Sequence, residues 1–443
     1  MAAAPAVEPA SIRSRTFSAL TDNPNYRRFY VGQGVSLIGT WLQDAAVSWL
    51  VFEMTGSEWW LGIVSASGVM PGLLVGLFAG ALADRVVPRT MILAMQVAQM
   101  LLAFALAALV AGGVVRIGHM IAILALTRIC VTFEMPSRQV FLYELVGRAQ
   151  LMNAIALNSG LFNASRVIGP ALAGLFLARF GATAPFVVNG VSYLAAIGSL
   201  LSIRVGPRAP ATGTGPAGAV LGGLGYLARD RRVAWLFALM AFFGTIGMGY
   251  TALVPAYARR VVHTQAVGYS VLLSAGGLGA TLGALVVASL GGLERKERLV
   301  LAGMGVFSGA LATAGVLPGV VADRGPAWGP VPAAALCLFG TGFGAILFYS
   351  ATQTLIQTAV PDELRGRIMG IWMIVFSGSV PLGALWAGLL ARSRGVAPVM
   401  ILSAALCAAA ALGVGSSGVL GRKDFTAENA EVKTERNHPG EKG

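Results

Sequence analysis

The feature that most constrains this chain is a series of apolar stretches, each about as long as a membrane is thick. A helix needs about 20 predominantly apolar residues to cross the hydrocarbon core of a bilayer. About twelve such stretches follow one another, at residues 29–52, 59–83, 91–112, 117–137, 153–178, 182–203, 233–256, 267–291, 299–320, 331–353, 368–391 and 397–419. We therefore predict an all-α integral membrane protein with twelve transmembrane helices.

The composition excludes a soluble protein. Hydrophobic residues make up 56% of the chain and charged residues only 12%, the reverse of what a water-exposed surface needs. The net charge of +13 would favour nucleic-acid binding in a soluble protein, but here the basic residues belong to loops beside a membrane. Three cysteines, Cys130, Cys337 and Cys407, lie inside apolar stretches and predict neither a metal site nor a disulfide framework. No cofactor is expected.

The positions of the basic residues predict the orientation. When alternate connections are assigned to the two sides of the membrane, 23 of the 32 Lys and Arg fall on one side and 7 on the other. Cytoplasmic loops carry the excess of Lys and Arg. Both termini and the longest connection, residues 204–232, are therefore expected in the cytoplasm, with the protein in the cytoplasmic (inner) membrane.

The longest connection divides the chain into two halves of six helices. Its Gly-, Pro- and Thr-rich start is typical of a linker. A shift of 214 residues places Gly169 on Gly383 and Gly174 on Gly388, which predicts two pseudo-symmetric bundles with a site between them. The expected parts are an N-terminal cytoplasmic segment (1–28), an N-terminal six-helix bundle (29–203), the cytoplasmic linker (204–232), a C-terminal six-helix bundle (233–420) and a disordered cytoplasmic tail (421–443).

One loop carries a family signature. Residues 80–89, GALADRVVPR, resemble the signature loop of the major facilitator superfamily: a Gly, three residues, Asp-Arg and a basic end. The chain departs from that signature at Val87, where a Gly is usual, and at Pro88. Further segments resemble the siderophore and macrolide exporter-like branch, which includes drug:proton antiporters; they are residues 25–43, 133–146, 153–174 and 364–372. The resemblance implies the major facilitator fold.

The resemblance also implies roles for two motifs. The resemblance implies that the signature loop latches the two halves in one conformation. The alternative is that its basic residues only mark the cytoplasmic side of the membrane. The loop residues are Gly80, Asp84, Arg85 and Arg89. A Gly-Pro motif in the fifth stretch is similar to one associated with proton-coupled exporters, and it favours export over uptake. Its Pro bends the helix and its glycines allow close packing, so generic packing is the alternative. The motif comprises Arg166, Gly169, Pro170 and Gly174.

Two charges inside the spans are the leading functional candidates. Asp44 lies within the first stretch and Arg128 within the fourth. An ionised Asp at the bilayer centre costs roughly 2.5–3.5 kcal/mol. In the family fold these two helices line the central cavity, so the side chains are expected to meet. We predict Asp44 as the proton carrier, because Arg stays charged, and Arg128 as its charge partner or an anion contact. The alternative is a structural ion pair that never titrates.

Other polar side chains in the spans are secondary candidates. Glu134 is the second candidate for proton coupling, although Arg138 follows it by one helical turn and favours a structural pair. The remaining candidates contact substrate or else bond neighbouring helices to one another. They are Trp41, Gln43, Tyr250, Tyr349 and Gln353, together with Asn158, Asn189 and Phe348.

These features predict a transporter rather than an enzyme. The sequence holds no P-loop, so ATP does not drive transport directly. We expect a monomeric secondary active exporter of hydrophobic or amphipathic small molecules, drug-like or siderophore-like, that works by alternating access with proton antiport. The alternatives are a proton-coupled importer of a small metabolite on the same fold, and a membrane scaffold or sensor without transport.

Overall fold

The computed structural model describes residues 17–72, 75–76, 86–203, 225–226, 230–290, 296–322 and 329–417. Every regular element within these ranges is a helix, as the apolar stretches predict. Ten segments of the described chain are long and apolar enough to cross a membrane. The expectation of an all-helical membrane protein is confirmed for this part of the chain.

The helices follow one another through both halves of the chain. The first half forms α2 (Ser18–Asp22), α3 (Pro24–Thr55), α4 (Glu58–Ser67), α6 (Pro88–Ala111), α7 (Ile117–Phe180) and α8 (Ala184–Ser202). The second half forms α10 (Arg231–Phe242), the π-helix η1 (Phe243–Gly247), α11 (Tyr250–Arg260), α12 (Ala266–Ser289), α13 (Lys296–Ala322), α14 (Val331–Ala359), α15 (Asp362–Arg394) and α16 (Val396–Ser417).

The expected span 233–256 is divided among α10, η1 and α11, and two further differences lie in the first half of the chain. The expected fourth and fifth spans form one element, α7, in which Gly147 alone has non-helical backbone angles, with φ of 66°. A positive φ is readily adopted by glycine, so Gly147 joins two helices end to end. Of the expected span 59–83, the structure describes α4 and short helical pieces at 70–72 and 75–76. The rest of that span lies outside the described residues.

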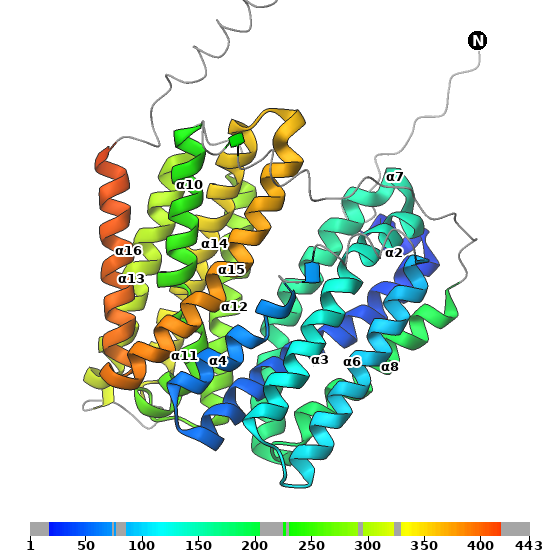
Figure 1. Ribbon diagram of the computed structural model, residues 1–443, viewed down its shortest axis with the longest axis horizontal. Coiled ribbons are helices and arrows are strands. Elements are labelled where there is room, and N and C mark those ends of the chain that lie inside the picture. Colours follow the sequence, from blue (N-terminus) through cyan, green and yellow to red (C-terminus); the bar gives the residue numbers. More distant parts are fainter. Residues whose placement is uncertain are drawn as a thin grey trace, which may run out of the picture.

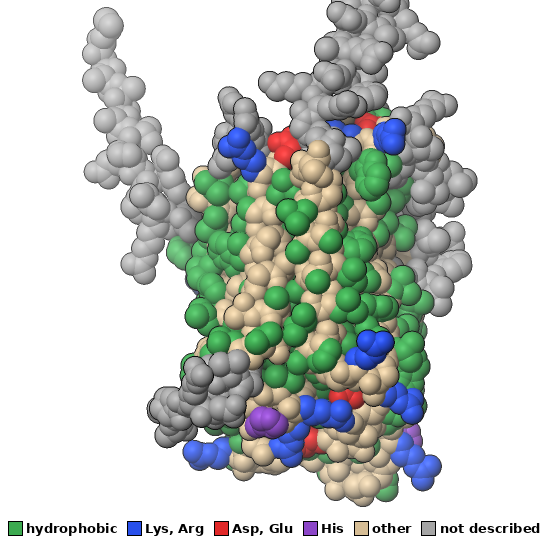
Figure 2. Space-filling model, turned by 90° about the vertical axis from the view of Figure 1, so that its left-hand side faces the viewer, with side chains coloured by type: hydrophobic (Ala, Val, Ile, Leu, Met, Phe, Trp, Pro, Cys, Tyr) green, Lys and Arg blue, Asp and Glu red, His purple; other side chains and the backbone are tan. Residues whose placement is uncertain are grey.

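Side chains are distributed over the surface as in a membrane protein. Figure 2 shows a face whose middle is covered mainly by apolar side chains, while the charged side chains gather toward its two ends. Large apolar residues lie well exposed along the helices, among them Leu285 at 62%, Leu336 at 71% and Leu412 at 75%. Exposed apolar side chains in such numbers are favourable only against lipid. The chain is a multi-pass membrane protein.

Two groups of helices lie side by side in Figure 1. One consists of the first-half helices α2, α3, α4, α6, α7 and α8, and the other of α10 to α16. Lipid provides no hydrophobic force between helices, so small residues and close backbone contact hold such groups together. Within the second group, a Cβ at Gly342 would lie 2.0 Å from the carbonyl oxygen of Gly276. Glycine at this position is what lets α12 and α14 pack so closely.

The two groups meet along a seam formed by two helix pairs. In one pair α7 packs on α12, where the Ser274 hydroxyl donates to the Val167 carbonyl at 2.9 Å. In the other pair α4 packs on α15, where a Cβ at Gly62 would lie 2.5 Å from the Ala384 carbonyl oxygen. The two groups approach each other most closely in the lower half of Figure 1, around α4 and α11.

Candidate functional site

Asp44 and Arg128 form an ion pair within the spans. Asp44 lies on α3 and Arg128 on α7, and Nη2 of Arg128 lies 2.7 Å from Oδ2 of Asp44. The side chains are 30% and 35% exposed, respectively. The pair is therefore neither sealed in the protein nor fully exposed. The expectation that the two charges meet is confirmed, whereas a role in proton transfer stays a prediction.

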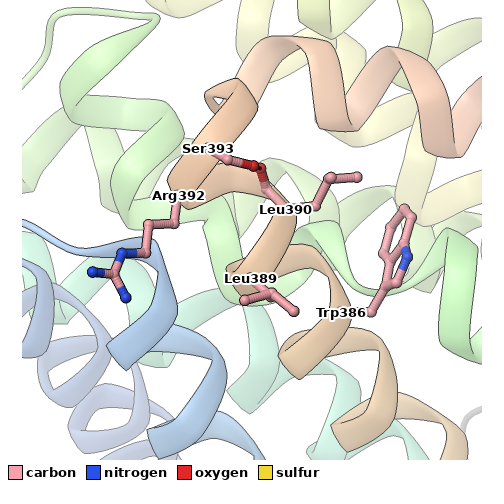
Figure 3. A pocket seen from close by; sticks show the side chains of 5 residues that line it. All are labelled: Trp386, Leu389, Leu390, Arg392 and Ser393. Atoms are coloured by element: carbon pink, nitrogen blue, oxygen red, sulfur yellow. Dashed lines mark hydrogen bonds between the residues drawn. The ribbon is translucent and has the colours of Figure 1, made fainter.

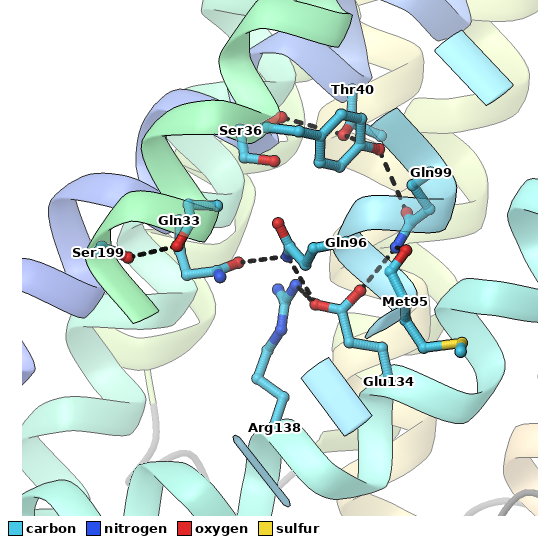
Figure 4. A network of polar contacts seen from close by, with 11 residues as sticks. Gln33, Ser36, Thr40, Met95, Gln96, Gln99, Glu134, Arg138 and Ser199 are labelled. Carbon is cyan, nitrogen blue, oxygen red and sulfur yellow. Dashed lines mark hydrogen bonds and ion pairs between the residues drawn. The ribbon is translucent and has the colours of Figure 1, made fainter. Parts of the chain in front are cut away.

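Glu134 lies in a different environment, inside the first group (Figure 4). Glu134 is only 3% exposed. One carboxylate oxygen accepts from the Gln96 amide at 2.9 Å, and the other from the Gln99 amide at 2.8 Å. The Arg138 guanidinium also pairs with it, one helical turn further along α7. Three donors hold this buried carboxylate, as a buried charge requires.

A hydrogen-bonded network joins Glu134 to the helix that carries Asp44. The Tyr193 hydroxyl on α8 donates to the Gln99 side-chain carbonyl at 3.2 Å. The same hydroxyl lies 3.4 Å from the hydroxyl of Thr40, which is one turn before Asp44 on α3. Tyr193 lies within electrostatic range of both acids. Four helices therefore share one polar network in the interior of the first group.

A second ion pair joins the two helix groups at the lower end of Figure 1. Oε1 of Glu58, on α4, lies 2.6 Å from Nη1 of Arg260, on α11, and the Glu58 side chain is only 2% exposed. Arg260 also donates to the carbonyl oxygen of Gly56, which ends α3 in a left-handed conformation. This guanidinium thereby binds both the start of one helix and the end of another across the seam.

Aromatic rings close the seam beside this ion pair. Trp49 of α3 stacks on Tyr269 of α12, with ring centroids 5.2 Å apart. The Tyr269 hydroxyl donates to the Ala45 carbonyl at 3.1 Å, next to Asp44 in the chain. Arg259 lies over the Trp49 ring at 6.0 Å, a cation–π contact. These contacts hold the two groups together between Asp44 and the lower end of the molecule.

The Gly-Pro motif of α7 lies along the seam. A Cβ at Gly169 would lie 2.4 Å from the Cβ of Trp41, so this glycine packs on α3. A Cβ at Gly174 would lie 2.4 Å from the Ser270 hydroxyl oxygen, so this glycine packs on α12 of the other group. Pro170 is buried within the helix between them. Close packing on both sides is therefore a property of the motif.

The candidates for substrate contact have different environments. The Gln43 amide oxygen accepts from Asn189 at 2.9 Å inside the first group, which fits the interhelical alternative. The Tyr250 hydroxyl bonds that of Thr341 at 2.9 Å. The Tyr349 hydroxyl is buried and has no hydrogen-bond partner among the residues that the structure describes, and its ring is edge-on to that of Phe376, with centroids 4.9 Å apart.

The other candidates take part mainly in packing contacts rather than in short hydrogen bonds. The Trp41 ring packs against that of Phe162, with centroids 5.6 Å apart. Gln353 is partly buried on α14. Phe348 is fully buried among aromatic rings of the second group, and Asn158 lies within reach of the Tyr26 hydroxyl at 3.5 Å. None of these placements tests a contact with substrate.

Most of the predicted latch lies outside the described residues, namely Gly80, Asp84 and Arg85. Arg89, at the start of α6, is described. Its guanidinium donates to the carbonyl oxygens of Leu200 at 2.9 Å and Leu201 at 3.2 Å. Cations stabilise the C-terminal end of a helix, so Arg89 binds α6 to the end of α8.

A pocket of about 460 Å³ opens on the surface near the end of α15 (Figure 3). Its walls are mainly apolar, and Arg392 extends in the opposite direction from Trp386. No residue of the two ion pairs or of the Glu134 network lines it. It is lined by Trp386, Leu389, Leu390, Arg392 and Ser393. Among the described residues, no group of three or more His, Cys, Asp or Glu could hold a metal ion.

Several residues of these networks were not predicted as site residues. Glu58 and Arg260 lie at helix ends, where charges are common and give no signal of pairing. Gln96 and Gln99 did give a signal, because they lie three residues apart inside an otherwise apolar span and so share one helix face. Tyr193 could not be distinguished from the other tyrosines of the spans without the fold.

Comparison with known proteins agrees with this architecture. The multidrug efflux pump Tap of Mycobacterium tuberculosis is 27% identical over 383 residues, which cover 82% of this chain and 85% of Tap. The enterobactin exporter EntS of Escherichia coli is 30% identical over 236 residues, 52% of each chain. These relatives are transporters, which confirms the expectation that the chain is not an enzyme.

Solved transporter structures have the same fold. The nucleoside transporter NupG superposes with a TM-score of 0.71 at 12% identity, covering 90% of this chain and all (100%) of NupG. A bacterial homologue of the human lysosomal transporter Spinster gives a TM-score of 0.65 at 15% identity, covering 91% and 96% of the two chains. Residues 14–434 match the family model described as transmembrane secretion effector. The chain therefore belongs to this family of the major facilitator superfamily.

Proposed function

We propose that this protein exports hydrophobic or amphipathic small molecules across the cytoplasmic membrane by proton antiport. The observation that carries the proposal is the Asp44–Arg128 ion pair, partly exposed in the middle of two spans. A carboxylate held by one guanidinium can be released by a single proton, after which Arg128 is free to change partner. The names of the relatives Tap and EntS support export.

The proposed architecture is twelve spans in two six-helix bundles, residues 29–203 and 233–420. α7 supplies two of the spans, and residues 59–83 supply one that the structure describes in part. The predicted repeat supports this division, because matched glycines make matched contacts. Gly169 and Gly383 each pack within their own group, whereas Gly174 and Gly388 each pack across the seam. The two pairs thus occupy equivalent places in the two halves.

The proposed orientation makes the lower end of Figure 1 the outer face. It follows from the excess of Lys and Arg in the connections at the opposite end. In this orientation the Glu58–Arg260 pair and the Trp49–Tyr269 stack close the outer side. Substrate would enter from the cytoplasm or inner leaflet, and a proton from outside would reset the carrier as the two bundles rock. The latch role of Gly80, Asp84 and Arg85 belongs to the same proposal.

The proposal is tested by dye transport in proteoliposomes under an imposed pH gradient. Ethidium and anilinonaphthalene sulfonate serve as cationic and anionic probes. The parent protein should drive dye against its gradient in exchange for protons. Transport by Asp44→Asn should be slower by about tenfold or more. Glu53→Gln, an exposed acid on the same helix α3, is the matched control and should transport normally.

Three outcomes contradict the proposal in different ways. If Asp44→Asn transports as fast as the parent protein at every pH, the carboxylate does not couple transport to protons. If dye moves in the same direction as the protons, the protein is an importer. If the parent protein moves neither protons nor either dye, the scaffold or sensor alternative is supported.

A further inference from the structure

One cation inside the spans has no partner among the described residues. Arg166 lies in the middle of the second segment of α7 and is partly buried. Its guanidinium makes no hydrogen bond or ion pair within the described chain. The other arginine inside the two α7 spans, Arg128, is paired with Asp44, and Arg138, one residue past the first span, is paired with Glu134. The charges of those two pairs cancel, so Arg166 is left as a positive charge with no counter-charge in the described part of the chain.

Arg166 lies on the seam between the two helix groups. A Cβ on Gly277 of α12 would lie 3.1 Å from the Arg166 carbonyl oxygen, and the next residue, Val167, accepts the hydrogen bond from Ser274. Its electrostatic neighbour is Tyr250 of α11, in the other group. The Tyr250 hydroxyl is bonded to Thr341 and carries no charge to offset the guanidinium.

An aromatic pair lies beside this cation. Phe162 precedes Arg166 by four residues, so the two side chains share one face of α7. Phe162 is 47% exposed, and its ring packs edge-on against that of Trp41. A charged group and an exposed apolar ring on one helix face together match a molecule with an acidic head and an apolar body.

We propose that Arg166 binds the acidic group of an anionic amphipathic substrate while Phe162 and Trp41 contact its apolar part. A guanidinium out of water favours a counter-anion, and its planar fork bonds carboxylate, sulfonate or phosphate oxygens at two points. The inference rests on the proposed export function, because it assigns the substrate of the same seam.

The test compares two dyes that differ by one charged group. Anilinonaphthalene sulfonate is an anion, and N-phenylnaphthylamine is the same aromatic skeleton without the sulfonate. Binding of each dye is measured by fluorescence titration of the full-length protein in nanodiscs of phosphatidylcholine, with empty nanodiscs subtracted. Because no pH gradient is applied, binding can succeed even where proton-driven transport fails, and the two proposals are judged separately.

The parent protein should bind the anion about tenfold more tightly than the neutral dye. Arg166→Gln should remove that preference and leave the neutral dye unchanged, whereas Arg166→Lys should keep part of it. Arg179→Gln, an exposed arginine near the end of the same helix, should behave as the parent protein. Thermal unfolding of all variants identifies any that fail to fold, and Arg166→Lys is the variant that keeps the charge if Arg166→Gln does not fold.

Three results would overturn the inference. One is an anion preference that survives in Arg166→Gln. Another is an equal loss of binding affinity for both dyes in a folded Arg166→Gln variant, which would make Arg166 a packing residue. The third is a parent protein that does not prefer the anion.

Discussion

At the scale of single residues, Asp44 and Glu134 differ in how many donors hold their carboxylates within the described chain. Glu134 is 3% exposed and is held by Gln96, Gln99 and Arg138. Among the described residues Asp44 is held by Arg128 alone, and its side chain is 30% exposed. On this difference in contacts we propose Asp44 as the proton carrier and Glu134 as a structural charge.

The structural role of Glu134 predicts a loss of stability on neutralisation. Glu134→Gln removes the charged acceptor of the Gln96 and Gln99 amides, and losing hydrogen bonds to a charged group costs about 1.5–3 kcal/mol. The Arg138 guanidinium that is left is 36% exposed and adds little to this cost. Unfolding by sodium dodecyl sulfate titration in mixed micelles measures the difference. Glu53→Gln, at an exposed position, should change the free energy of unfolding by less than about 0.5 kcal/mol. An unchanged stability of Glu134→Gln would contradict the structural role.

Arg166 shows why a charge must be judged with its partners. From the sequence it was one member of the Gly-Pro motif, and only the fold shows that its guanidinium, unlike those of Arg128 and Arg138, has no partner in the described chain. Asp44 and Arg128 could be matched in advance, because two opposite charges in apolar spans have few other ways to be stabilised.

At the scale of helices, glycines determine how closely the two groups approach. Gly174→Val places a Cβ where the Ser270 hydroxyl oxygen would be 2.4 Å away, so α7 and α12 must separate. We expect transport to fall by about tenfold or more, because closure at the seam is incomplete. Gly160→Val on the same helix, where a Cβ meets nothing within 4 Å, is the control. Equal dye transport by the two variants would show that this contact has no role in the cycle.

The sequence predicted the helices better than it predicted the seam. Apolar stretches of bilayer length follow from the requirement that each span be apolar on its own, so their approximate limits could be read locally. Which helices face one another depends on pairs distant in the chain, such as Gly62 with Ala384 or Ser274 with Val167. The 214-residue repeat gave part of this information, since Gly174 and Gly388 both lie at the seam.

The fourth and fifth spans show that a helix boundary is harder to predict from the sequence than a helix. The expected limits, 117–137 and 153–178, left residues 138–152 as a connection, but the structure continues as helix on both sides of Gly147. A single glycine with positive φ suffices to join the two segments, and the apolar pattern on either side does not distinguish a loop from such a junction.

At the scale of the whole molecule, alternating access requires the lower end to open. The Glu58–Arg260 pair is the charged link across the seam there. Arg260→Gln removes one partner and leaves the nearly buried Glu58 carboxylate unpaired, which disfavours the closed state. We expect the population of molecules open at that end to increase severalfold.

Spin labels measure this opening directly. Cysteines at Glu53 and His263, both exposed near that end, are introduced into a variant that lacks Cys130, Cys337 and Cys407. Double electron–electron resonance should then show a longer-distance population in Arg260→Gln. The charge-swapped double variant Glu58→Arg with Arg260→Glu should restore the short distance. Identical distance distributions in the parent protein and Arg260→Gln would exclude the pair as a link that holds this end closed.

The central claim is that the carboxyl group of Asp44 gains and loses a proton. Infrared difference spectroscopy of the reconstituted protein, recorded as the pH is lowered, detects the carbonyl stretch of each newly protonated carboxyl group. We expect the parent protein to show one such band that is absent from Asp44→Asn and retained in Glu53→Gln. A spectrum of Asp44→Asn that matches the parent protein over the whole pH range at which it remains folded would contradict the account.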